Sequence, residues 1–154
     1  MSIFLADEQT ESVPLGELHR LAEIILIQEG YPEEAEVTLL FVSDEEMAGY
    51  NQRFLDREGP TDVLAFPVEE LIPGVVPDRD PNGPPMMLGD VIVAPAHVRR
   101  QATELEVDFE DEMALMVTHG LLHLLGYDHV EDVDADRMEA RERELLAMVG
   151  KVRR

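Results

Sequence analysis

Apolar side chains recur along the chain with the period of a helix in some segments and of a strand in others. Residues 14–29 carry apolar side chains three or four positions apart, namely Leu15, Leu18, Leu21, Ile24 and Ile25. This spacing predicts an amphipathic helix. Pro14 suits the first turn of such a helix, and Gly30 suits its end.

Short apolar segments rich in β-branched residues predict three strands, at residues 37–42, 62–66 and 88–94. Further helices are expected between and after them. Ser43 and Glu46 form a capping box that opens a helix of about 12 residues through Leu55. Pro95 begins another helix, and Asp108 can cap one that runs to about Leu125.

The last predicted helix covers residues 134–149, and a loop rich in proline, glycine and aspartate is expected at residues 71–85. The chain has no internal repeat and no clear boundary between domains, and its 154 residues suit one domain. The sequence therefore predicts a single α+β domain over residues 1–154, with a small mixed sheet packed by about five helices.

The amino-acid composition limits the kinds of metal site and binding partner that the chain can have. The chain has no cysteine, so a disulfide or a thiolate metal site is excluded and any metal must be held by imidazole or oxygen. The net charge of -22 repels polyanions, although a local arginine cluster can override it within a Debye length of about 8–10 Å. No basic leader or membrane-length apolar run is present, so we expect a cytoplasmic protein without a membrane partner.

Three histidines stand out in the segment 119–129. His119 and His123 are four positions apart, so both imidazoles lie on one face of a helix. Gly126 can end that helix in a left-handed conformation and let the chain return His129 to the pair. Three nitrogen ligands that leave a position for water are typical of a catalytic zinc site of the zincin kind. We therefore predict one zinc ion per chain, which would lower the pKa of a bound water to about 7.

The same histidine spacing occurs in the metzincin metalloproteases, H-E-x-x-H-x-x-G-x-x-H. In those enzymes the glutamate takes a proton from the zinc-bound water. Gly120 occupies its position here and cannot do so. A protease of that type is therefore disfavoured.

Glycine in second place, with Tyr127 and Asp128 before the third histidine, resembles the YbeY family of bacterial metal-dependent endoribonucleases. Residues 119–129 match the motif H-G-x-L-H-L-x-G-Y-D-H throughout, and residues 60–66 and 89–92 are similar to further family segments. The resemblance implies a zinc-dependent, single-strand-specific endoribonuclease of α+β fold. It also implies rRNA and ribosomal particles as partners, with roles in maturing the 3′ end of small-subunit rRNA and in ribosome quality control.

One position departs from the family pattern. The family commonly has an arginine where this chain has Leu55, and a guanidinium there would suit a phosphate. Arg57 and Arg53 are candidates to replace it, Arg57 as a catalytic group and Arg53 as a substrate contact. Arg99 and Arg100 are further candidate contacts to RNA phosphates.

Asp128 is a candidate proton acceptor, but it could equally orient a histidine or form the turn. Two other functions stay open. The chain could be a non-catalytic ribosome-assembly factor that contains zinc. Leu55 supports this alternative, because it replaces the family's arginine. It could instead be a metallohydrolase of a peptide or small ester. Imidazole ligands also suit nickel, copper and iron.

Overall fold

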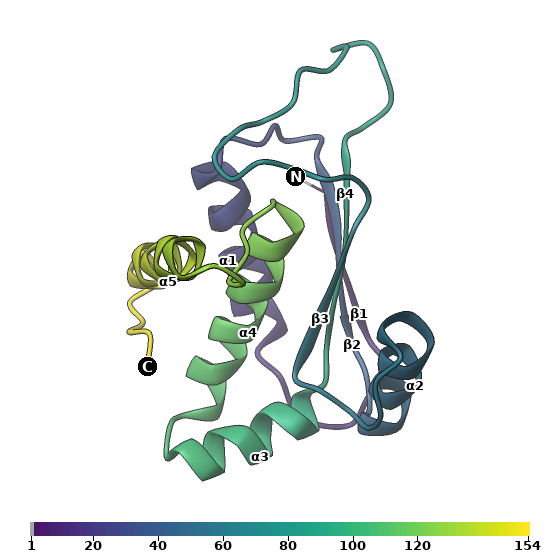
Figure 1. Ribbon diagram of the computed structural model, residues 1–154, viewed down its shortest axis with the longest axis vertical. Helices are drawn as coiled ribbons and strands as arrows, with labels where there is room; N and C mark the ends of the chain where they lie inside the picture. Colours follow the sequence, from purple (N-terminus) through teal and green to yellow (C-terminus); the bar gives the residue numbers. More distant parts are fainter. Residues whose placement is uncertain (1) are drawn as a thin grey trace.

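A four-stranded mixed sheet separates one helix from the other four (Figure 1). The computed structural model describes residues 2–154. Its elements are β1 (Ser2–Asp7), α1 (Leu15–Gln28), β2 (Glu36–Phe41), α2 (Asp44–Leu55), β3 (Val63–Pro67), β4 (Met87–Val93), α3 (Pro95–Leu105), α4 (Phe109–Leu124) and α5 (Asp132–Ala147). The expected α+β class is confirmed.

The strands lie in the order β1-β2-β4-β3. The pairs β1–β2 and β2–β4 are parallel, whereas β3 runs antiparallel to β4. Helix α2 covers one face, where Met47 packs with Leu64 and Ile92. Helices α1 and α4 cover the other face and form the larger core together with α5. Helices therefore pack on both faces of the sheet, but the α2 face is only partly covered, since Phe4 and Asp90 on it are exposed.

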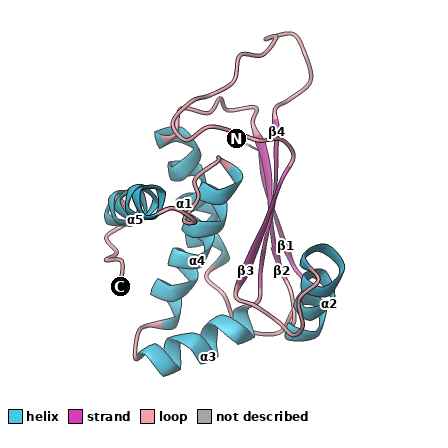
Figure 2. Ribbon diagram, viewed as in Figure 1, coloured by secondary structure: helices cyan, strands magenta, loops and turns pink. Residues whose placement is uncertain are grey.

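Most element boundaries follow from local chemistry. Ser43 Oγ accepts a hydrogen bond from the backbone N–H of Glu46 at 3.2 Å and begins α2 as expected. Asp108 caps α4 in the same way, through the N–H of Asp111 at 3.1 Å. Residues 71–85 form the expected loop, which projects beyond the end of the sheet (Figure 2). Among residues 2–154, no helix has both the length and the apolar character that crossing a membrane would need.

Strand β1 was not predicted. It lies at the edge of the sheet and pairs on one side with β2. Its alternation is weak because Ile3 is buried while the neighbouring apolar residue Phe4 is 54% exposed. A short edge strand without strict alternation gives little local signal, so pairing with β2 decides its conformation.

Gly120 lets α4 lie close against the sheet. A Cβ atom at this position would be 2.6 Å from Cγ1 of Val91 on β4 and 3.0 Å from Cγ2 of Val63 on β3. Both distances are shorter than side-chain carbons normally approach. The glutamate of a metzincin would therefore not fit here, which gives a steric reason for the glycine in the motif.

We expect Gly120→Ala to lower the free energy of unfolding by about 1–2 kcal/mol, because overpacking outweighs the better helix propensity of alanine. Gly49→Ala in α2 is the matched control, since a Cβ there meets no atom within 4 Å. It should raise stability by up to about 1 kcal/mol. Urea unfolding of both variants measures the difference, and a stabilised Gly120→Ala protein would contradict the close approach.

Candidate metal centre

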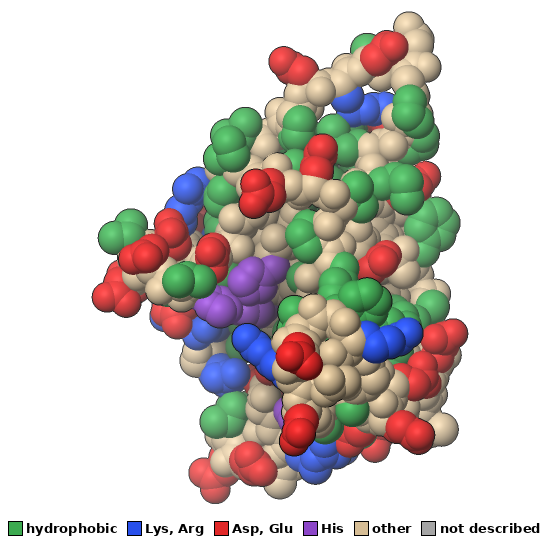
Figure 3. Space-filling view, turned by 45° about the vertical axis from the view of Figure 1, so that its right-hand side comes forward, with side chains coloured by type: hydrophobic (Ala, Val, Ile, Leu, Met, Phe, Trp, Pro, Cys, Tyr) green, Lys and Arg blue, Asp and Glu red, His purple; other side chains and the backbone are tan. Residues whose placement is uncertain are grey.

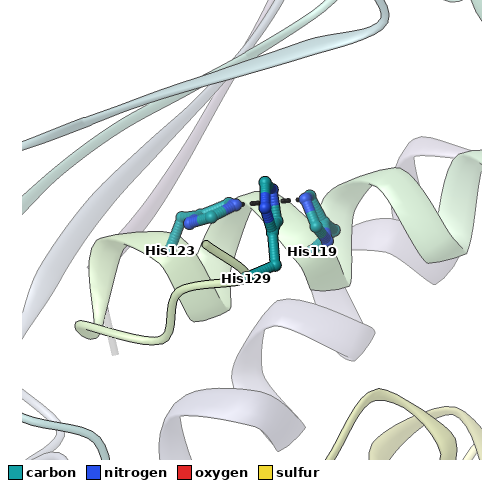
Figure 4. Close-up of side chains that lie close together, drawn as sticks. All are labelled: His119, His123 and His129. Atoms are coloured by element: carbon teal, nitrogen blue, oxygen red, sulfur yellow. Dashed lines mark hydrogen bonds between the residues drawn. The ribbon is translucent and has the colours of Figure 1, made fainter. Parts of the chain in front are cut away.

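The structure brings His119, His123 and His129 together at the end of α4 (Figure 4). One ring nitrogen from each histidine lies within 4.8 Å of the other two, so the three could hold a metal ion. His119 and His123 project from successive turns of α4, and His129 comes from the loop that follows. The expected grouping of these side chains is present in the fold.

The loop after α4 is shaped by two residues of the motif. Gly126 has a φ of +101°, and a Cβ there would lie 2.1 Å from the carbonyl oxygen of Leu71, so only glycine fits. Asp128 Oδ1 then accepts hydrogen bonds from the backbone N–H groups of His129 at 2.6 Å and Val130 at 3.1 Å. These bonds give Asp128 the turn-forming role and aim the chain back toward α4.

Hydrogen bonds at Nδ1 determine which nitrogens face the shared space. His123 Nδ1 donates to the carbonyl oxygen of Tyr127 at 3.0 Å, because a carbonyl can only accept. His119 Nδ1 donates to Oε2 of Glu142 at 2.8 Å. In the neutral rings both Nε2 atoms then carry lone pairs, and they lie 3.1 Å apart, the contact marked in Figure 4. Two acceptors at this distance repel each other unless a cation lies between them, so the donor set fits a metal ion.

Glu142 of α5 is 1% exposed and supports the cluster from behind. Its Oε1 accepts a hydrogen bond from Nε of Arg153 at 2.9 Å. Burial alone would raise the pKa of Glu142, but hydrogen bonds and charge from His119 and Arg153 outweigh it, so the pKa lies below its usual value. The carboxylate thus stays ionised and can orient His119.

The electrostatics of His123 favour its metal-binding form. Burial, together with the charges of His119 and His129, lowers the pKa of His123 to about 4, against the opposing hydrogen bond to Tyr127. The imidazole is therefore neutral at pH 7. Only the neutral ring has a lone pair to give to a metal.

A cavity of about 320 Å³ opens beside the histidines. Its apolar wall comes from β3 and α4 and comprises Val63, Ala65, Leu115 and Met116, and its polar groups are the three histidines, Asp62, Arg153 and Arg154. Figure 3 shows the histidines in a hollow of the surface with Lys or Arg side chains bordering them. A larger cavity of about 540 Å³, between α1 and residues 148–151, has none of these histidines in its wall.

The arginines proposed from sequence do not line the histidine cavity. Arg53 lies over the ring of Tyr50 at 5.1 Å, on the face of the sheet that α2 covers. Arg99 pairs with Glu11, and Arg100 pairs with Asp44, both at 2.8 Å. Arg57 follows the end of α2 and is exposed.

Four residues near the histidines were not identified as site residues from sequence, namely Asp62, Glu142, Arg153 and Arg154. The sequence pattern could have indicated Glu142, because it shares one face of α5 with the apolar residues Met138 and Leu145. A carboxylate is unusual on such a buried face. No local sequence pattern indicated Arg153 and Arg154, because they follow the last helix. They reach the cavity through contacts with Glu142 and Glu112, which lie earlier in the chain.

Comparison with known proteins agrees with this arrangement. A family model described as Endoribonuclease YbeY matches residues 5–150. The chain is 42% identical to an Endoribonuclease YbeY from Acidothermus cellulolyticus, over 95% of this chain and 90% of that protein. It is 38% identical to one from Mycolicibacterium gilvum, over 95% of this chain and 82% of that protein. The solution structure of a Thermotoga maritima protein superimposes with a TM-score of 0.63 at 29% identity, covering 96% of this chain and 91% of that one.

Glu142→Gln should weaken zinc binding by about 10- to 100-fold, because the amide orients and polarises His119 less well than the carboxylate. Competition with a zinc-binding dye measures the dissociation constant. Glu144→Gln is the control, since Glu144 lies on α5 but is exposed and pairs with Arg141. Equal zinc affinities in the two variants would rule out the supporting role of Glu142.

The metal-free protein should lose stability as the pH falls from about 7 to about 4. Because the pKa of His123 is about 4 when folded and ~6.5 when unfolded, the unfolded chain takes up the proton first. The contribution of neutral His123 to the free energy of unfolding is therefore complete above pH ~6.5 and is lost as the pH falls toward about 4. His123→Gln should show a shallower slope in chemical unfolding across this range, and an unchanged slope would refute the assignment.

Proposed function

Because the chain belongs to the Endoribonuclease YbeY family, we propose that it is a zinc-dependent endoribonuclease that cleaves single-stranded RNA. The proposed pathway is rRNA processing, with maturation of the 3′ end of small-subunit rRNA and ribosome quality control, and residues 1–154 form one catalytic domain. The observation that carries the proposal is the convergence of two Nε2 lone pairs and a third imidazole beside an open cavity.

His119, His123 and His129 are the residues that would hold the zinc ion, one per chain. When bound, the ion supplies Lewis-acid catalysis toward a phosphodiester. The charge of Glu142 behind His119 favours a divalent cation at this place. Zinc is preferred to nickel, copper and iron because three imidazoles with an open position are typical of catalytic zinc.

The proton acceptor must come from outside the second position of the motif, because Gly120 has no room for a side chain. Asp62 lines the cavity, and its Oδ1 accepts a hydrogen bond from the N–H of Val63 at 2.7 Å. Asp128 is not among the residues that line this cavity, and its Oδ1 accepts the two backbone N–H groups of the turn that carries His129. Asp62 is therefore the better candidate to accept a proton, and Asp128 acts by positioning His129.

A non-catalytic zinc-containing assembly factor is the second candidate. Leu55 at the family's arginine position favours it, because Arg53 and Arg57 do not line the cavity in its place. Such a protein would bind zinc and ribosomal particles without cutting RNA. A metallohydrolase of peptides is less favoured, since it would need the missing glutamate.

His123→Ala should lose both the zinc ion and RNA cleavage, because it removes one of the three nitrogens that would hold the ion, on a ring oriented by its hydrogen bond to Tyr127. Elemental mass spectrometry of the purified protein should give one zinc per chain, reduced also in His119→Ala and His129→Ala. Cleavage is followed on single-stranded RNA, with casein as the alternative substrate. His19→Ala is the control, since His19 pairs with Glu23 on α1 and should retain both properties.

Zinc binding without RNA cleavage in the wild-type protein would favour the assembly factor. Cleavage of casein would favour the peptide hydrolase. RNA cleavage that survives in His123→Ala would remove the zinc site from the mechanism.

A further inference from the structure

The segment after α5 passes beside α4 (Figure 1), and three of its basic residues form ion pairs with acidic residues of α4 and α5. Lys151 Nζ lies 2.8 Å from Oδ1 of Asp111. Arg153 Nε lies 2.9 Å from Oε1 of Glu142, and Arg154 Nε lies 2.7 Å from Oε1 of Glu112. These contacts bring two consecutive arginines into the wall of the histidine cavity.

The two glutamates are unusual anchors, because each is only 1% exposed. A buried carboxylate is unfavourable unless its oxygens are paired. Glu142 is paired by His119 and Arg153, and Glu112 by Arg154 and by Nε2 of Gln101 at 2.6 Å. The arginines are therefore held by interior charges rather than by a mobile surface pair.

The guanidinium groups of Arg153 and Arg154 differ in how many of their nitrogens are still available to bind a ligand. Arg153 also places Nη1 at 2.7 Å from the carbonyl oxygen of Arg154 and Nη2 at 3.4 Å from Glu139, so its nitrogens are occupied. Arg154 uses Nε for Glu112, and within residues 2–154 its two terminal nitrogens have no hydrogen-bond partner. Its side chain is 38% exposed and lines the cavity.

We infer that Arg154 binds a phosphate of the RNA next to the histidine cluster, while Glu112 fixes its guanidinium from behind. This inference rests on the proposed function. A guanidinium offers two parallel N–H groups that match two phosphate oxygens, and the contact is stronger in a partly desolvated cavity. Because one edge of the group is already anchored, little side-chain entropy is lost when the phosphate binds.

A purely structural role for Arg154 would be to neutralise Glu112. Lysine could do that as well, since one ammonium can pair with one carboxylate oxygen. The two remaining N–H groups of lysine diverge tetrahedrally, so they do not form the planar, parallel pair that matches two phosphate oxygens. Arg154→Lys therefore separates the two roles, and Arg154→Gln removes both.

The test measures binding of a short, 2′-O-methylated single-stranded RNA to the zinc-loaded protein by fluorescence anisotropy at several salt concentrations. Arg154→Gln and Arg154→Lys should each weaken binding by about tenfold or more. Loss of the phosphate contact in Arg154→Gln should also reduce the slope of log K against log salt by about 0.7. Arg20→Gln is the charge-matched control, because Arg20 is exposed on α1 and lines only the larger cavity, and it should bind RNA as the wild type does.

Thermal unfolding of each variant accompanies the binding data. If Arg154→Gln no longer folds, Arg154→Lys decides the question, because it keeps a cation beside Glu112. The inference about Arg154 would be overturned if Arg154→Lys bound RNA with wild-type affinity, or if Arg20→Gln weakened RNA binding as much as Arg154→Gln does. The proposed function would still stand in that case if the wild-type protein cleaves RNA. A wild-type protein that neither binds nor cleaves RNA would overturn both.

Discussion

The close packing of α4 against the sheet at Gly120 is the constraint on which the candidate site depends. Because this glycine has no side chain, the helix can approach Val91 and Val63 closely. His119 and His123 of the same helix then line the cavity beside β3. The same approach leaves no space for a glutamate at this position. One steric fact therefore positions two of the grouped histidines and excludes a glutamate as proton acceptor at this place in the helix.

A second requirement is the pairing of buried charge. Glu112 on α4 and Glu142 on α5 are both inside the protein, and each is satisfied by an arginine of the segment after α5. Glu142 also orients His119, so the interior ion pairs and the metal centre share one network. Removing a partner from such a network leaves an unpaired buried charge, which costs far more than loss of a surface pair.

The strongly negative net charge does not decide the partner by itself. Charges separated by more than a Debye length of about 8–10 Å are largely screened, so a phosphate in the cavity responds mainly to groups nearby. Those groups include three imidazoles and two guanidiniums, together with Asp62. Glu142 and Glu112 offset the charges of these two guanidiniums, so a divalent cation on the histidines would be the main source of positive charge for a phosphate, in a chain whose acidic residues outnumber its basic ones by 34 to 12.

The sequence alone indicated every element except β1, and the grouping of the three histidines, because these features depend on neighbours within a few positions. Helical periodicity, the caps at Ser43 and Asp108, and the spacing of the histidines with Gly126 are local signals, and the structure contains each of these features.

Tertiary structure decided β1 and the arginines of the cavity. Strand β1 forms by pairing with a distant strand, and Arg53 lies on the opposite face of the sheet although its segment is near the family motif. Arg154 reaches the cavity through Glu112, 42 positions earlier in the chain. Such contacts leave no local pattern, because they arise only when helices and strands pack around one core.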